Sequence, residues 1–165
     1  MKLVFTFLTL IPFFIFGQND LPKREAFELN LPLGNGKFYQ YKVPQSNYFV
    51  YKTDLQIYPT EEIFIEIELN GSRIISMKTV KEKLNPSKTL IVSFNQETKN
   101  GKSNIMVLKV HNPFPLTLNY STLIHSSDSK KWKLHKPYKV SPLSNSYEMF
   151  NTPLVTIVLK NWKFQ

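Results

Sequence analysis

Hydrophobic and polar residues alternate along much of the chain with the two-residue period of a β-strand. In the stretch 62–69, apolar residues occupy one face and glutamates the other, with Ile63, Ile65, Ile67 and Leu69 opposite Glu62, Glu66 and Glu68. Successive side chains of a strand point to opposite faces, so this pattern predicts a strand with one buried face. Further strands are predicted at 37–43, 48–58, 73–78, 89–94, 105–110, 116–124, 132–134 and 154–164. We find no apolar stripe of helical period over ten or more residues.

Three Asn-Gly pairs lie next to these runs, at Asn35-Gly36, Asn70-Gly71 and Asn100-Gly101. Both residue types tolerate positive φ, which a type I′ hairpin turn requires. A two-residue loop at Asn70-Gly71 would place Glu68 opposite Arg73 as a cross-strand charge pair. Eight to ten short strands with frequent turns predict an all-β chain folded as an antiparallel β-sandwich, with a closed barrel as the alternative.

The N-terminal residues have the layout of a secretory signal peptide. Lys2 precedes a mostly apolar run at 3–16, and Gly17 is followed by a polar stretch. The run is shorter than the roughly 20 residues that a membrane-spanning helix needs, although an uncleaved anchor is the alternative. We therefore expect a signal peptide at 1–17 and a single β-sandwich domain at 18–165. The mature chain, cleaved near Gly17, would be periplasmic or extracellular and would have no transmembrane segment.

The composition excludes several functional classes. The 165 residues include no Cys, which excludes disulfide scaffolds, zinc ribbons and thiol catalysis. No Rossmann, Walker, EF-hand or metalloprotease motif is present, so we expect neither a cofactor nor an enzyme. The formal net charge of +9 instead favours an anionic partner.

The most basic part of the chain is residues 130–139, which contain no acidic residue. The candidate binding residues for an anionic or protein partner are Lys130, Lys131, Trp132, Lys133, His135, Lys136 and Lys139. Outside the cytoplasm, such a partner would be an envelope protein, an acidic polysaccharide or a lipid surface, and we expect no nucleic acid. The alternative interpretation is that lysines at strand edges prevent edge-to-edge aggregation.

Tyrosines form a second candidate site. Tyr39 and Tyr41 are two residues apart and share one face of a predicted strand. Exposed aromatic rings with a hydroxyl suit sugar binding, so the alternative function is a polysaccharide-binding module that uses this face. The competing interpretation is half-buried packing between strands.

Histidines suggest no metal site. If Ile124 pairs with Trp132, His125 and His135 both lie on the outer face of the hairpin, about 13 Å apart along the strand. That separation is too large for a shared zinc ion, whose ligand nitrogens lie roughly 2.0–2.1 Å from the metal. We therefore expect no metal ligand.

Short motifs in the C-terminal half follow a fixed order over residues 89–164. They are Asn112-Pro113-Phe114, Leu118-Asn119-Tyr120, Trp132-Lys133, Ser141-Pro142-Leu143, Tyr147-Glu148-Met149-Phe150, Pro153-Leu154 and the final strand 157–162. In order and spacing, this half resembles an uncharacterised family of small exported bacterial proteins with an immunoglobulin-like β-sandwich. The resemblance implies export and an immunoglobulin-like fold, and it supplies no catalytic residues. Together, these features predict an exported, non-catalytic binding or accessory module of the cell envelope.

Overall fold

The computed structural model describes residues 21–34, 36–99, 102–129 and 131–165. The predicted signal peptide at 1–17 and Lys130 therefore lie outside the described residues. Strands account for 70% of the structure and helix for 2%, so the prediction of an all-β chain is confirmed. The helical part is one short 3-10 turn, η1 at Pro86–Lys88.

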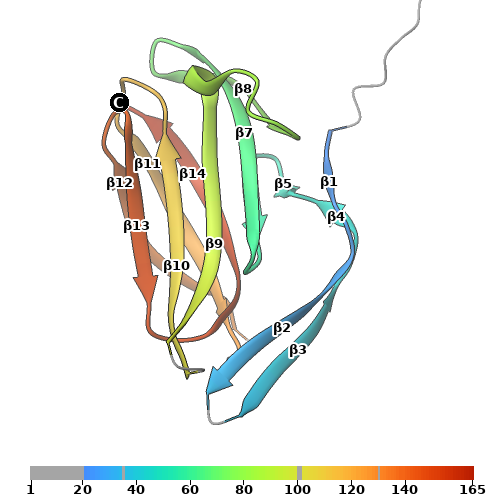
Figure 1. Cartoon of the computed structure of the whole chain (residues 1–165). Helices are drawn as coiled ribbons and strands as arrows, with labels where there is room; N and C mark the ends of the chain where they lie inside the picture. The colour runs from blue at the N-terminus through green and yellow to red at the C-terminus, as the bar shows by residue number, and fades with distance from the viewer. Residues whose placement is uncertain (1–20, 35, 100–101, 130) are drawn as a thin grey trace, which may run out of the picture.

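Two five-stranded antiparallel sheets form the two layers of a sandwich (Figure 1). Sheet I has the order β13–β10–β9–β7–β8, with bounds Ser144–Phe150, Lys102–Asn112, Thr89–Lys99, Glu61–Asn70 and Arg73–Val80. Sheet II has the order β12–β11–β14–β6–β5, with bounds Lys133–Val140, Leu118–Ser126, Leu154–Phe164, Asp54–Ile57 and Phe49–Tyr51. The predicted antiparallel sandwich is confirmed. Each sheet combines hairpins of consecutive strands with pairs that are distant in sequence, such as β10 with β13 and β6 with β14.

The N-terminal strands do not pair with either large sheet. β2 (Phe27–Gly34) and β3 (Lys37–Val43) form a hairpin that runs diagonally beside the sandwich (Figure 1). The short strand β1 (Lys23–Arg24) pairs with β4 (Ser46–Asn47). Leu29 and Leu31 of the hairpin are buried in the same hydrophobic core as both sheets. Side-chain packing, together with a hydrogen bond from the Gln96 amide to the Pro32 carbonyl at 2.8 Å, therefore holds this hairpin to the sandwich without a shared backbone ladder.

The core confirms the alternation read from residues 62–69. Ile63, Ile65 and Ile67 are at most 3% exposed, whereas Glu62 and Glu68 are exposed. Burying each such side chain stabilises the fold by roughly 1.5–3 kcal/mol, which fixes the faces of β7.

The predicted pairing of Glu68 with Arg73 is wrong, although the hairpin itself is confirmed. The loop is Gly71-Ser72, so Asn70 lies opposite Arg73. A bulge between Glu68 and Leu69 then places Glu68 opposite Ser76, whose hydroxyl donates to the Glu68 carboxylate at 3.0 Å. Gly71 has a φ of 59°, whereas Asn70 and Ser72 do not have positive φ, so the turn needs only one residue in this conformation. The face pattern could not reveal this shift, because both registers keep the isoleucines buried.

The other two predicted hairpins are also present. β2 pairs with β3, and β9 pairs with β10 up to the contact of Lys99 with Lys102. The turn residues Asn35, Asn100 and Gly101 lie outside the described residues.

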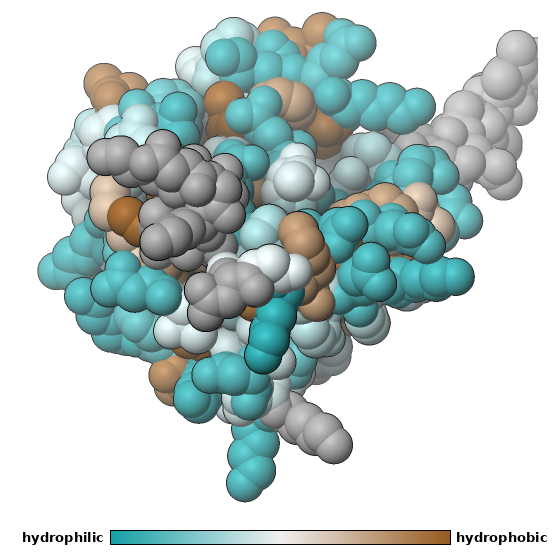
Figure 2. Space-filling view, turned by 60° about the horizontal axis from the view of Figure 1, so that its bottom comes forward, coloured by the Kyte–Doolittle hydropathy of each residue, from teal (hydrophilic) through white to brown (hydrophobic). Residues whose placement is uncertain are grey.

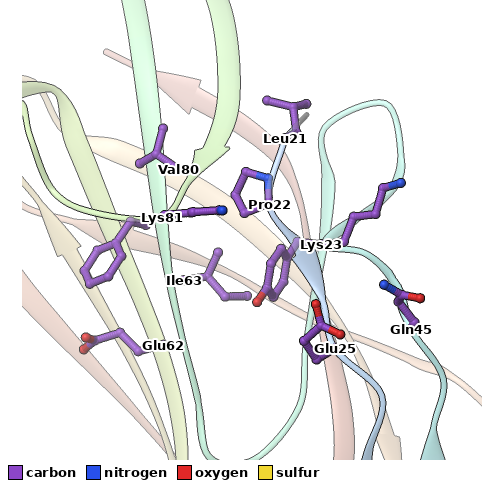
Figure 3. A pocket seen from close by; sticks show the side chains of 11 residues that line it. Leu21, Pro22, Lys23, Glu25, Gln45, Glu62, Ile63, Val80 and Lys81 are labelled. Atoms are coloured by element: carbon purple, nitrogen blue, oxygen red, sulfur yellow. The ribbon is translucent and has the colours of Figure 1, made fainter. Parts of the chain in front are cut away.

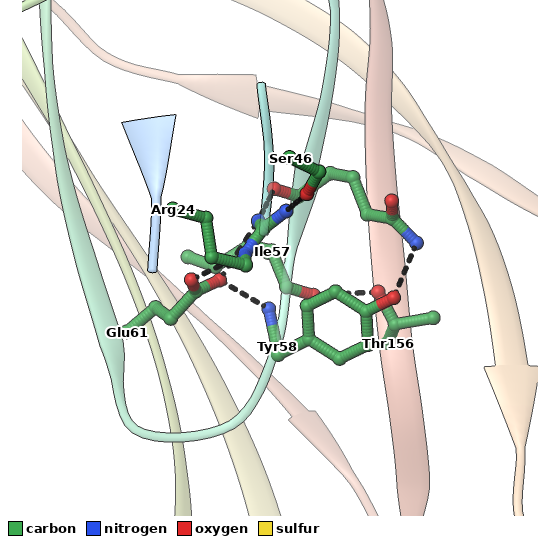
Figure 4. Close-up of polar contacts among 7 residues, drawn as sticks. Arg24, Ser46, Ile57, Tyr58, Glu61 and Thr156 are labelled. Carbon is green, nitrogen blue, oxygen red and sulfur yellow. Dashed lines mark hydrogen bonds and ion pairs between the residues drawn. The ribbon is translucent and has the colours of Figure 1, made fainter. Parts of the chain in front are cut away.

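A buried arginine connects the N-terminal segment to the sandwich (Figure 4). Arg24 is 1% exposed, and its Nε and Nη2 atoms donate to the two carboxylate oxygens of Glu61 at 2.6 and 3.0 Å. Its remaining donors reach the Ser46 hydroxyl at 2.9 Å and the Gln56 carbonyl at 2.7 Å. One guanidinium group thus joins β1, β4, β6 and the start of β7.

Two tyrosines enclose this ion pair. The Arg24 guanidinium carbon lies 4.9 Å from the ring centroid of Tyr48 and 4.8 Å from that of Tyr58. The backbone N–H of Tyr58 also donates to Glu61 Oε2 at 2.8 Å. Hydrogen bonds and ring faces thus replace the water that the buried charges lose. Burial raises the pKa of both tyrosines, so their rings pack as neutral groups.

Replacing Arg24 with Met should destabilise the chain by about 3 kcal/mol, because it leaves the Glu61 carboxylate mostly buried without its partner. The matched control is Lys42→Met, which removes the exposed Lys42–Glu28 ion pair and should cost less than about 1 kcal/mol. Urea unfolding followed by circular dichroism measures both changes. Equal losses for the two variants would contradict the role of Arg24.

Candidate functional site

The basic segment forms an edge of the sandwich. β12 pairs with β11 on one side and is the last strand of sheet II on the other. We use the name basic edge for its described candidate residues, Lys131, Trp132, Lys133, His135, Lys136 and Lys139. All four lysines are exposed. The ion pairs among the described residues involve other cations, so no described carboxylate lies within 4.0 Å of these lysines. The edge therefore presents positive charge that no direct ion pair among the described residues neutralises, although the fields of Lys133 and Lys136 reach the nearby carboxyl groups of Asp128 and Glu148.

The residues of the basic edge lie on two faces of β12. Lys133 is opposite Ile124 and shares its face, whereas Lys139 is opposite Asn119. Between these positions β12 has one extra residue relative to β11, which shifts the register. Lysines that are close together in sequence therefore point to two different faces of the strand.

Exposed apolar side chains accompany the lysines. Leu134 is 70% exposed and Trp132 is 45% exposed. The ring centroids of Trp132 and His125 lie 5.2 Å apart. Figure 2 shows that hydrophobic residues on this view of the molecule form separate patches among hydrophilic ones. The basic edge is therefore a mixed surface that offers both charge and small apolar contacts.

The predicted placement of His135 on the outer face is wrong. Ile124 pairs with Lys133 rather than with Trp132, so His135 lies opposite the buried Thr122. A shift of one residue moves a side chain to the other face of a strand. His135 Nδ1 is hydrogen-bonded to the Tyr138 hydroxyl at 2.7 Å, and its ring packs edge-on against Phe150 of sheet I. This histidine thus holds β12 against the opposite sheet.

Burial raises the pKa of the groups behind the basic edge. Burial, together with the nearby charge of Glu148, raises the pKa of Tyr138 to about 12. Burial also raises the pKa of Tyr120, and it raises that of Glu148 against the opposing charge of Lys136. The tyrosines act here as packing and hydrogen-bonding groups, while the exposed lysines carry the charge.

Tyr39 and Tyr41 share one face of β3, as the sequence predicts. They lie opposite Leu31 and Leu29, so this face packs towards the core. The Tyr41 ring stacks on Tyr58 with 6.4 Å between centroids, yet Tyr41 remains 41% exposed. A cavity of about 360 Å³ lies beside it. Sugar binding by this face stays a prediction, and Tyr41 is the residue placed to make the contact.

Further hollows were not predicted from the sequence, and two of them share Glu62. We call these two the large and the small hollow with respect to each other. The large hollow, of about 420 Å³, lies between Leu21, Pro22 and Lys23 on one side and Ile63, Val80 and Lys81 on the other (Figure 3). The small hollow, of about 220 Å³, lies on the outer face of sheet I and is lined by Glu62, Lys83, Ser93, Lys109, His111 and Asn145. In β10, alternation with the buried Met106, Leu108 and Val110 places His111 on the outer face. The sheet order that joins it to Glu62 and Asn145 has no comparable sequence pattern.

The pKa of Tyr138 predicts a pH dependence of stability. Because its folded-state pKa lies above the ordinary value of 10, the neutral phenol stabilises the fold below pH 10 and this contribution is lost as the pH rises towards about 12. The free energy of unfolding should therefore fall more steeply between pH 9 and pH 12 in the parent chain than in Tyr138→Phe. Urea unfolding at several pH values tests this, and parallel curves would contradict it.

The described residues include no helix with the length and hydropathy needed to cross a membrane. In the same residues, no group of three His, Asp or Glu side chains is arranged to hold a metal ion. Comparison of the chain with family models, curated proteins and solved structures finds no match. The resemblance of residues 89–164 to small exported proteins therefore stays a prediction.

Proposed function

We propose that the chain is an exported, non-catalytic binding module of the cell envelope that holds an anionic partner on the basic edge. The observation that carries this proposal is the set of exposed lysines on β12 without a described carboxylate partner. Export is supported by the apolar run at 3–16 that follows Lys2.

The lack of direct ion pairs favours a partner over a purely protective role for these lysines. A close ion pair within the chain would have neutralised more of the field, whereas here much of the field extends into solvent. Such a field attracts an oppositely charged surface and speeds encounter with it. Trp132 and Leu134 then offer apolar contact beside the charges. An envelope surface with lipid phosphates or acidic sugars has the complementary charge.

The triple variant Lys133→Gln, Lys136→Gln and Lys139→Gln should bind weakly to vesicles that contain phosphatidylglycerol. Each lysine near an anionic surface contributes about 1 kcal/mol, so we expect a loss on the order of 100-fold at low salt. The loss should shrink as salt rises, because exposed charges are screened over about 8–10 Å at physiological ionic strength. Vesicle co-sedimentation over a range of lipid concentrations gives the affinities.

The matched control is Lys37→Gln, Lys42→Gln and Lys52→Gln, which removes the same charge from the N-terminal half. It should weaken binding far less than the basic-edge variant. Vesicles of neutral lipid measure any contribution of the apolar N-terminal residues. If the two triple variants lose affinity equally, net charge alone governs binding and the basic edge is not the site.

A further inference from the structure

The small hollow brings together polar groups from four strands. His111 lies opposite Asn145, and Lys109 lies opposite Ser93 on one side and Tyr147 on the other. On the next strand, Glu62 also lies opposite Ser93. Cross-strand neighbours have Cβ atoms about 4.5–5.5 Å apart, so these side chains form two adjacent rows across sheet I. Lys83, from the loop after β8, adds a second ammonium group to the hollow.

The charges of this hollow are not paired with one another. Among the described residues, neither Lys83 nor Lys109 lies within 4.0 Å of a carboxylate, and Glu62 has no cation at that distance. The Lys109 ammonium lies 5.7 Å from the ring centroid of Tyr147, which is 55% exposed. Two ammonium groups next to one carboxylate suit a ligand that has an acid group and hydrogen-bond donors.

The dimensions favour one unit of a polymer over a free small molecule. Pockets that enclose small ligands usually have about 300–1,000 Å³, and the small hollow has about 220 Å³. Glu62 also lines the large hollow, to which Lys23 and Lys81 bring two further ammonium groups and Glu25 a second carboxylate. A ligand long enough to occupy both hollows would gain contacts that neither offers alone.

The position on a sheet face favours a polysaccharide over a peptide. Extended peptides gain affinity by adding a strand to an exposed sheet edge. β9 and β10 are inner strands of sheet I, paired on both sides, so their backbone groups are already used. Recognition at the small hollow must therefore come from side chains, as suits a ligand with many hydroxyl groups.

We infer that an acidic polysaccharide lies across the outer face of sheet I, with one uronate unit in the small hollow. The sugar carboxylate accepts hydrogen bonds from Lys83 and Lys109. The Glu62 carboxylate accepts a hydrogen bond from one sugar hydroxyl, and the Asn145 amide contacts a second hydroxyl. The Tyr147 ring packs against the sugar ring. This surface belongs to the other sheet from the basic edge, so the inference goes beyond the proposed function and can fail or succeed independently.

The first experiment measures binding of tetragalacturonate to the purified chain by isothermal titration calorimetry. The double variant Lys83→Gln and Lys109→Gln should lose on the order of tenfold in affinity, because it removes both charge pairs with the sugar carboxylate. The matched control, Lys133→Gln and Lys136→Gln on β12, removes the same charge and should change affinity less than about twofold. An equal loss in both variants, or no loss in the first, would overturn the inference.

The second experiment uses Glu62→Gln, for which two explanations predict opposite signs. If Glu62 accepts a hydrogen bond from a sugar hydroxyl, the variant should bind tetragalacturonate about threefold more weakly. A hydrogen bond to a charged carboxylate is stronger than one to a neutral amide. If the hollow merely attracts polyanions, removing a negative charge should tighten binding. Tighter binding, or equal affinity of the parent chain for tetraglutamate, would show a polyanion or peptide site and overturn the inference.

A neutral probe completes the test. Maltotetraose has the same number of sugar units without carboxylates, and it should bind at least tenfold more weakly than tetragalacturonate. Equal affinity for the two sugars would contradict the binding of the sugar carboxylate by Lys83 and Lys109. The substituted residues Glu62 and Lys83 are exposed and Lys109 is partly exposed, so circular dichroism and urea midpoints should match those of the parent chain.

Discussion

The buried ion pair of Arg24 and Glu61 is the interaction on which the placement of the N-terminal third depends. The described residues between 21 and 47 form no backbone ladder with either five-stranded sheet. The β2–β3 hairpin adds apolar packing and a hydrogen bond from Gln96 to the Pro32 carbonyl, and the Arg24 guanidinium joins the segment to β6 and β7. An ion pair buried this deeply costs several kcal/mol of desolvation, which its four hydrogen bonds and two tyrosine rings must offset. Its geometry is therefore specific, and the neighbouring residues are held with it.

One consequence of this contact lies on the outer surface. Pro22 and Lys23 form one wall of the large hollow because Arg24 fixes the chain beside β7. Glu62 follows Glu61 directly and lines both hollows. A contact that stabilises the fold thus also shapes the surface on which we infer acidic sugar binding. The basic edge lies in sheet II and has no such dependence, so the two surfaces are separable by mutation.

Local patterns predicted much of the fold, and non-local pairing decided the rest. The alternation of Ile63, Ile65 and Ile67 gave the buried face of β7, since it depends on one strand alone. Bulges moved Glu68 opposite Ser76 and turned His135 inward, because one extra residue changes the register without changing the apolar pattern. The basic edge was foreseen because its lysines are adjacent in sequence. The small hollow was not, because its residues meet only through the order of the strands in sheet I.

Hydrogen–deuterium exchange of the chain, with and without phosphatidylglycerol vesicles, tests the central claim most directly. β12 ends sheet II, so the outward-facing amides of 133–140 lack a neighbouring strand and exchange quickly in the free chain. If the basic edge holds the anionic partner, exchange in this strand should slow on addition of vesicles and recover at high salt. Protection confined to the β2–β3 hairpin, with β12 unchanged, would contradict the proposed function.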